Sequence, residues 1–155
     1  MYSKILVAVD ESETSRHALQ QAIKLAQNLS ASVRMVHVLD MSWLPIGPEV
    51  AIDTGALSAA RRGVGEKIIA AVRDTAKAAG FEADAVLIET ETPTQQVAET
   101  IVREAARWGA DLLVMGTHGR RGFQHLMLGS VAEQTVRRSP GPVLLIPSPK
   151  GRPSA

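Results

Sequence analysis

The sequence predicts an α/β protein in which helices cover both faces of a doubly wound, five-stranded parallel sheet. The hydrophobic pattern switches repeatedly between continuous apolar runs of strand length and segments with helical periodicity. Most of these runs consist almost entirely of Val, Ile and Leu, which is typical of strands buried on both faces. Because strands and helices alternate along the chain, the strands are expected to be parallel and joined by helical crossovers.

The first half of the chain supplies two expected strands and two expected helices. Residues 5–9 form an apolar run that ends at Asp10, and a helical stripe of apolar residues then extends to Leu29. Residues 33–39 form the second strand. Residues 57–79 predict a long helix, which the glycine directly after it terminates.

The second half repeats the alternation, beginning with a strand over residues 85–89. Thr92 and Gln95 have the spacing of a capping box, with Pro93 at the first helical position, so a helix is expected to begin there and to reach about Trp108. The remaining expected elements are a strand over 111–116, a short helix over 130–138 and a strand over 142–147.

Length and composition restrict the functional classes. A chain of 155 residues favours one domain, which we place at residues 1–147, followed by a polar tail over 148–155. The net charge is +1 and aromatic residues make up 3%, so neither coating of a phosphate backbone nor stacking of bases on aromatic rings is favoured. Cysteine is absent, which excludes disulfides, thiolate metal sites and cysteine nucleophiles.

The sequence also gives expectations about location and partners. The N-terminal apolar run is shorter than the core of a secretory signal peptide, and no run approaches the roughly 18 residues of a membrane span. We therefore expect a cytoplasmic protein with no membrane and no nucleic-acid partner. Residues 40–55 contain Pro and Gly without periodicity, and a connection of this length is usually functional or interfacial, so an unidentified protein partner could bind there.

Residues that follow the strands are the first candidates for a binding site, because ligands of open α/β sheets bind beyond the carboxyl ends of the strands. Asp10 follows the first strand, Asp40 follows the second, and a glycine-rich segment over residues 116–130 follows the fourth. Glycine permits close approach of backbone amides to a phosphate, and the start of the next helix favours an anion. Residues 116–138 contain four arginines and one glutamate, a local charge of +3. This segment predicts a phosphate site.

The familiar phosphate loops do not fit. The sequence contains no GxxxxGK[ST] segment, and the first strand leads into Asp10-Glu11-Ser12 where a dinucleotide-binding turn would have GxGxxG. A receiver-type phospho-acceptor site would need a lysine after the fifth strand, where Pro147 and Ser148 stand.

The glycine-rich segment resembles the ATP-binding signature of the universal stress protein family, Gly-x2-Gly-x9-Gly-Ser, through Gly116, Gly119, Gly129 and Ser130. Asp10 after the first strand, VHVLD in the second and SVAEQTVRRSPGPVLLIP near the end also match, so the resemblance covers residues 2–147. It implies the strand order 3-2-1-4-5, with ATP, accompanied by Mg²⁺ on its phosphates, across the ends of strands 1, 2 and 4.

The resemblance also assigns residues. Ala8 and Asp10 would line the adenosine pocket, and Val38 would hydrogen-bond adenine through its backbone. The phosphates would be held by Gly116, Gly119, Gly129 and Ser130, with Thr117, His118, Arg120, Arg121 and Gly122 nearby. A homodimer would form through the fifth strand, over Val143, Leu144, Leu145 and Ile146, because an unprotected apolar edge invites pairing.

Structural alternatives remain for several of these residues. Asp10 could cap the first helix with Glu13 reciprocating, and Ser130 with Glu133 forms another possible capping box. Arg120 and Arg121 could be a solvated turn, and the four histidines could be structural, exposed or, in the glycine-rich segment, in contact with phosphate. No histidine pair has metal-ligand spacing, so we expect no structural metal.

Three functions remain open at this point. The first is an ATP-binding module for stress or signalling whose nucleotide state alters a surface that partners read. The second is a weak ATPase or phosphoryl-transfer enzyme, although no carboxylate is obviously placed as a base, and we assign no catalytic residue. The third is a nucleotide-free dimerisation module.

Overall fold

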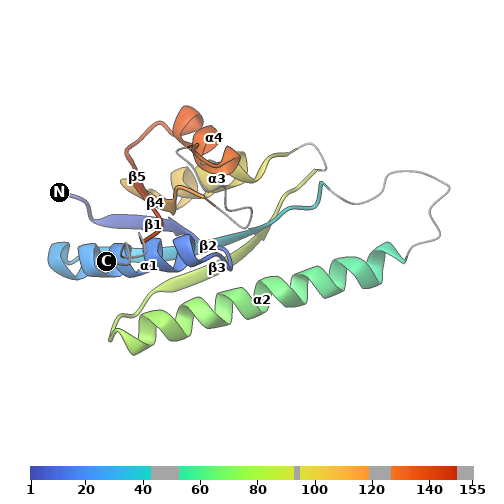
Figure 1. Cartoon of the computed structure of the whole chain (residues 1–155), viewed down its shortest axis with the longest axis horizontal. Coiled ribbons are helices and arrows are strands. Elements are labelled where there is room, and N and C mark those ends of the chain that lie inside the picture. Colours follow the sequence, from blue (N-terminus) through green and yellow to red (C-terminus); the bar gives the residue numbers. More distant parts are fainter. Residues whose placement is uncertain (43–52, 93–94, 119–126, 150–155) are drawn as a thin grey trace, which may run out of the picture.

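The five strands form a single parallel sheet in the order β3-β2-β1-β4-β5, which confirms the predicted doubly wound α/β architecture. The computed structural model describes residues 1–42, 53–92, 95–118 and 127–149. Its elements, coloured along the chain in Figure 1, are β1 (Lys4–Ala8), α1 (Glu13–Leu29), β2 (Ser32–Leu39), α2 (Thr54–Ala78), β3 (Asp84–Glu89), α3 (Val97–Trp108), β4 (Leu112–Gly116), α4 (Ser130–Arg138) and β5 (Val143–Ile146).

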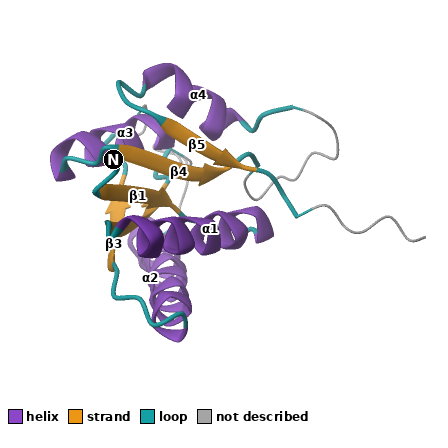
Figure 2. Ribbon diagram, turned by 90° about the vertical axis from the view of Figure 1, so that its left-hand side faces the viewer, coloured by secondary structure: helices purple, strands orange, loops and turns teal. Residues whose placement is uncertain are grey.

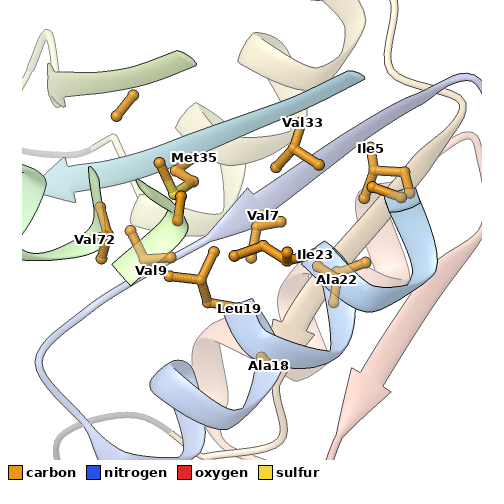
Figure 3. Packing of buried hydrophobic residues seen from close by; sticks show 14 of the residues in the cluster. Ile5, Val7, Val9, Ala18, Leu19, Ala22, Ile23, Val33, Met35 and Val72 are labelled. Carbon is orange, nitrogen blue, oxygen red and sulfur yellow. The ribbon is translucent and has the colours of Figure 1, made fainter. Parts of the chain in front are cut away.

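Helices cover the sheet on both faces, α1 and α2 on one and α3 and α4 on the other (Figure 2). The alternation of side chains along β1 explains the two layers: Val7 lies in the core under α1 and α2, whereas Leu6 lies in the core under α3 and α4. Figure 3 shows the first of these cores, where Leu19 and Ile23 of α1 pack against Val7 and Met35.

The capping of several helices differs from what the sequence suggested, and two of them also begin at a different residue. Helix α1 is capped by Ser12, whose side chain accepts from the Ser15 N–H, so the alternative in which Asp10 caps this helix is wrong. Helix α2 begins at Thr54, earlier than predicted, because the side chain of Asp53 accepts from the Ala56 N–H.

Helix α3 begins at Val97, so the predicted start at the Thr92–Gln95 capping box is wrong. The Gln95 N–H donates to the Thr92 carbonyl, and the Gln95 side chain accepts from the Glu91 N–H, which makes a turn ahead of the helix. Gln96 then has extended backbone angles and occupies the capping position without a side-chain cap. Pro93 lies outside the described residues.

Helix α4 is capped by Gly129, so the capping box expected from Ser130 and Glu133 is wrong as well. The Gly129 N–H donates to the Thr117 carbonyl at 2.8 Å, which holds Gly129 in an extended conformation. Ser130 therefore becomes the first helical residue, and the Glu133 carboxylate pairs with Arg137.

The opposite edge of the sheet, where the strands begin, carries an ion cluster around the buried Glu104. Arg34 of β2 bonds Glu104 of α3 at 2.8 Å and Asp84 of β3 at 2.6 Å, and Arg107 also bonds Glu104. The guanidinium of Arg34 lies 5.0 Å from the centre of the Trp108 ring. In the part of the chain that the structure describes, no helix has the length and apolar character needed to cross a membrane.

Candidate functional site

The strand order brings the carboxyl ends of β1, β2 and β4 together, with β1 in the middle. Ala8 is the last residue of β1 and pairs with Val36 of β2, and on the other side Val7 pairs with Val114 of β4. Beyond these pairs, the chain turns out of the sheet after β1 and after β4. The strand order reverses between these two strands, so the two turns lie on either side of the switch point. Ligands of this fold class bind at such a point.

Asp10 orders the loop between β1 and α1. Its Oδ1 accepts from the Ser12 N–H at 2.7 Å, and its own N–H donates to the Ser15 hydroxyl at 2.8 Å. Because Ser12 already caps the helix, Asp10 is not used as a cap. The half-buried Asp10 carboxylate thus lies at the carboxyl end of β1, with Oδ2 without a partner among the described residues.

Val38 is placed beyond the last contact between β1 and β2. The Val9 N–H donates to the Val36 carbonyl at 2.8 Å, but among the described residues no backbone hydrogen bond joins Val38 to Val9. The His37 ring takes this position, because its Nδ1 bonds the Val9 carbonyl at 2.7 Å. The backbone N–H and carbonyl of Val38 consequently face the space beside β2 where β1 has already turned into its loop. His37 is buried and has a structural role, one of the roles expected for the histidines.

The end of β4 is packed tightly against α1 and tied to α4. A Cβ on Gly116 would lie 2.7 Å from Cγ2 of Thr14, so this position requires glycine. Thr117 follows: its N–H donates to the Ile146 carbonyl at 3.0 Å, and its carbonyl accepts from Gly129. These bonds fix both ends of the glycine-rich segment and hold the end of β4 close to the start of α4.

His118 is the last described residue before the central part of the segment. Its Nδ1 bonds the Thr117 hydroxyl at 2.9 Å, and its buried Nε2 has no partner among the described residues. The four predicted phosphate-site residues that follow directly, together with one further histidine, lie outside the described residues: Gly119, Arg120, Arg121, Gly122 and His125.

A pocket of about 270 Å³ lies at this edge of the sheet, between the starts of α3 and α4. Its lining comes from Asp40 and Ser42 after β2, from residues 95–98 at the start of α3, and from Ser130, Val131 and Gln134 of α4. Among the described residues, the Ser130 hydroxyl has no hydrogen-bond partner. The first hydrogen bond of α4 runs from the Glu133 N–H to the Gly129 carbonyl, so the N–H groups before Glu133 have no partner within the helix.

A larger hollow of about 550 Å³ lies at the far edge of the sheet, between the end of α2 and the start of β3. Its lining mixes charges of both signs, among them Arg73, Lys77, Glu82 and Asp84. Because it lies away from the carboxyl ends of the strands, we take the smaller pocket as the candidate site.

Among the predicted site residues, the structure places Ala8, Asp10, Val38, Gly116, Thr117, His118, Gly129 and Ser130 at the carboxyl edge of the sheet, and of these the pocket lining includes Ser130. Sequence reasoning missed Gln95, Gln96 and Gln134. Gln95 was assigned to a capping box. The observed start of α3 depends instead on the bond between the Gln95 side chain and the Glu91 N–H, which no local sequence pattern predicts.

One charged pair among the described residues lies at the carboxyl end of β3. Glu89, the last residue of β3, accepts a hydrogen bond from Arg62 of α2, and this bond holds the pKa of Glu89 below its ordinary value. Within the described ranges, no group of three or more His, Asp or Glu is placed to hold a metal ion.

The sequence model of the Universal stress protein family matches residues 1–147. This chain belongs to the universal stress protein family. Among its relatives, Universal stress protein MJ0531 of Methanocaldococcus jannaschii is 33% identical over 150 residues, which cover 97% of this chain and 85% of the relative.

Solved structures of universal stress proteins share the fold. One from Burkholderia pseudomallei is 36% identical, covers 94% of this chain and 96% of its own, and gives a TM-score of 0.76. The universal stress protein from Archaeoglobus fulgidus in complex with dAMP is 23% identical, with 94% and 98% coverage and a TM-score of 0.64. Complexes with cAMP and with AMP are also among the structures that share this fold.

Proposed function

We propose that this universal stress protein binds ATP, with Mg²⁺ carried on the phosphates, across the carboxyl ends of β1, β2 and β4. One observation carries the proposal: the first turn of α4 opens into a pocket next to the glycine-rich segment, with the Ser130 hydroxyl not used for capping. A helix start with unpaired N–H groups favours an anionic ligand. Solved neighbours with the same fold hold adenine nucleotides, which supports this choice of ligand.

Each predicted residue then has a role. Asp10 and Ala8 line the adenosine end, and the unpaired backbone edge of Val38 bonds the base. Gly116, Gly119, Gly129 and Ser130 hold the phosphates, close to Thr117, His118, Arg120, Arg121 and Gly122. Because the Gly129 N–H is already bonded to Thr117, glycine is needed there for its lack of a side chain, and the N–H groups that follow it contact the ligand.

Binding of ATP would act as a signal through the surface around the site. The glycine-rich segment is tied at both ends, to β5 through Thr117 and to α4 through Gly129, so a ligand held there acts directly on α4 and the neighbouring strands. The connection over residues 40–55 follows β2 at the same edge and is the proposed contact for a protein partner.

The proposed homodimer forms through β5, which is the edge strand next to β4. Leu144 is exposed on this strand, and an apolar edge with unpaired backbone groups favours pairing with a second copy. Light scattering at micromolar concentration should give the mass of two chains. Leu144→Lys should give the mass of one chain, and a monomeric unmodified protein would contradict the pairing.

Calorimetric titration of ATP with Mg²⁺ tests the binding site, with GTP as the ligand control. Gly129→Val should abolish saturable binding, since Gly129 has φ −60° and ψ 151°, angles that valine can adopt, while its side chain would block the approach of the phosphates. Gly141→Val is the matched control: a Cβ there meets no atom within 4 Å, and the residue precedes β5 at the opposite edge.

The two variants separate the outcomes. Loss of binding in Gly129→Val alone, with both variants folded by circular dichroism, supports the proposed site. Unchanged binding in Gly129→Val, or no binding by the unmodified protein, rejects it. Phosphate release measured on the same samples distinguishes a binding module from a weak ATPase.

A further inference from the structure

The two residues that follow β5 are bonded to the start of α1. Nδ1 of His17 bonds the Pro147 carbonyl at 3.0 Å, and the hydroxyls of Thr14 and Ser148 bond each other at 2.9 Å. His17 lies one helical turn after Thr14, so both bonds come from the same face of α1. Ser148 is the first residue of the predicted polar tail, yet its side chain contacts a helix that begins at the carboxyl edge of the sheet.

Thr14 lies between the loop after β1 and the end of β4, the two parts of the candidate site on either side of the switch point. It is 5% exposed. Ser12 and Ser15, which flank it in the chain, both bond Asp10 and order the loop after β1. Toward β4, the Thr14 methyl carbon Cγ2 is the atom that a Cβ on Gly116 would approach to 2.7 Å. The position of Thr14 therefore decides what the first residue of the glycine-rich segment packs against.

The bond to Ser148 fixes the orientation of the Thr14 side chain. A threonine in a helix has two common rotamers, because its hydroxyl can also bond a carbonyl of the preceding turn. In the rotamer that the bond to Ser148 selects, the methyl group lies next to Gly116. Hydroxyl and methyl group are attached to the same Cβ, so a hydroxyl that turned to another partner would move the methyl group with it.

We infer that Ser148 and Thr14 are positioning residues for phosphate binding. Ser148 holds Thr14 in the rotamer that packs on Gly116, and Thr14 in turn fixes the point at which the glycine-rich segment leaves β4. Both residues act without contact to the ligand. The inference rests on the proposed nucleotide binding and extends the site to a residue beyond the last strand. Because the bonds of Asp10 do not involve Thr14, the effect falls on the phosphates rather than on the adenosine.

Calorimetric titration of ATP with Mg²⁺ into two single variants tests this inference. Ser148→Ala removes the hydroxyl that holds Thr14, and Thr14→Ser keeps that bond but removes the methyl group next to Gly116. Each variant should bind ATP about 2- to 10-fold more weakly than the unmodified protein, the factor that corresponds to one hydrogen bond or one buried methyl group. AMP, which has one phosphate, should lose less affinity than ATP in both variants.

Combined substitutions show whether the two residues act together. Ser148→Ala should have no further effect in Thr14→Ser, because no methyl group is left for Ser148 to orient, whereas independent roles would give additive losses. Gly116→Ala offers a complementary test. Its added Cβ would clash with Cγ2 of Thr14, so Gly116→Ala combined with Thr14→Ser should bind ATP more tightly than Gly116→Ala alone.

Ser139→Ala and Thr75→Ser are the matched controls. The Ser139 hydroxyl bonds the Gly141 carbonyl before β5 begins, and the Thr75 hydroxyl bonds a carbonyl of its own helix, so both variants should leave the affinity for ATP unchanged. Ser148 is exposed, so Ser148→Ala should fold as the unmodified protein does, which circular dichroism checks. This variant keeps the test decisive if the changes at buried positions prevent folding.

The outcomes separate this inference from the proposed function. If the unmodified protein binds ATP and Gly129→Val abolishes binding, while Ser148→Ala binds ATP as the unmodified protein does, the positioning role is rejected and the nucleotide site stands. Additive losses, or equal losses for ATP and AMP, reject the positioning role as well. If the unmodified protein binds no adenine nucleotide, both are rejected. A non-additive loss that is larger for ATP than for AMP supports both.

Discussion

Gly116, the last residue of β4, lies against Thr14 in the first turn of α1. A Cβ on Gly116 would be 2.7 Å from Cγ2 of Thr14, closer than Cβ atoms pack in proteins, and 3.2 Å from its carbonyl carbon, which is tighter than most such contacts. The contact joins the glycine-rich segment to the loop that holds Asp10, since Thr14 and Asp10 belong to the same connection between β1 and α1. Two parts of the proposed nucleotide site are therefore packed directly on each other.

Gly116→Ala should reduce stability, because the added methyl group must displace the backbone of Thr14 as well as its side chain. Overpacking of this kind typically costs about 1–3 kcal/mol. Urea unfolding followed by circular dichroism measures the change. Gly141→Ala is the control, since its new Cβ meets no atom within 4 Å. Equal midpoints for the two variants would show that β4 and α1 are not tightly packed at this point.

Helix α2 contains two glycines that alanine should affect differently. A Cβ on Gly63 meets no atom within 4 Å, so Gly63→Ala should stabilise the helix by up to about 1 kcal/mol, through its better helix propensity. A Cβ on Gly65 would lie 2.8 Å from Cδ1 of Leu87 in β3, so the same gain is offset by a clash between helix and sheet. Thermal unfolding should place Gly63→Ala above Gly65→Ala, and the reverse order would contradict the close approach of α2 to β3.

The fold was predictable because its signals are repeated along the chain. Every apolar run named from the sequence became a strand, and parallel pairing followed from the helices between them. The caps were less predictable, because each depends on one competing hydrogen bond. Gln95 bonds Glu91, which moves the start of α3 to Val97, whereas Gly129 bonds Thr117 and caps α4, which begins at Ser130 as predicted.

Residues of the candidate site could be predicted from the sequence where the backbone conformation or packing requires one residue type. Gly116 was named from the glycine pattern as a phosphate-site residue, and in the structure it packs tightly against Thr14; Ser130, named from the same pattern, lies in a pocket at a helix start. Gln95 could not be found in this way, since its unpaired amide results from burial and from the orientation that Glu91 imposes. A local sequence motif predicts neither the burial of this amide nor its orientation.

Arg34 should be much more important for stability than Arg107, although both bond Glu104. The Glu104 side chain is 2% exposed, and without Arg34 it would keep one partner, Arg107, whose side chain is 71% exposed. Arg34→Met should therefore cost about 3–5 kcal/mol, the usual result of leaving a buried charge without its partner. Arg107→Met should cost no more than about 1 kcal/mol, as for a surface ion pair. Chemical unfolding of both variants checks the difference, and similar losses would contradict it.

Asp111 joins the start of β4 to the start of β1 and should make stability depend on pH. Burial raises its pKa, but the hydrogen bonds from the N–H groups of Ser3 and Lys4 and from the Ser3 hydroxyl outweigh this effect, so the pKa lies below its ordinary value. A carboxyl group with a lowered pKa contributes stability above its unfolded-state pKa of about 4, and this contribution is lost as the pH falls below that value.

Asp111→Asn should therefore destabilise the protein at pH 7 by about 1–2 kcal/mol, because an amide has a single acceptor oxygen where the carboxylate accepts through both. The difference from the unmodified protein should shrink as the pH is lowered from 5 to about 2, where the carboxylate becomes protonated. Melting temperatures measured across this range test it. Asp74→Asn, on the exposed side of α2, should show no such convergence. A difference between Asp111→Asn and the unmodified protein that is constant with pH would mean that the Asp111 bonds do not depend on its charge.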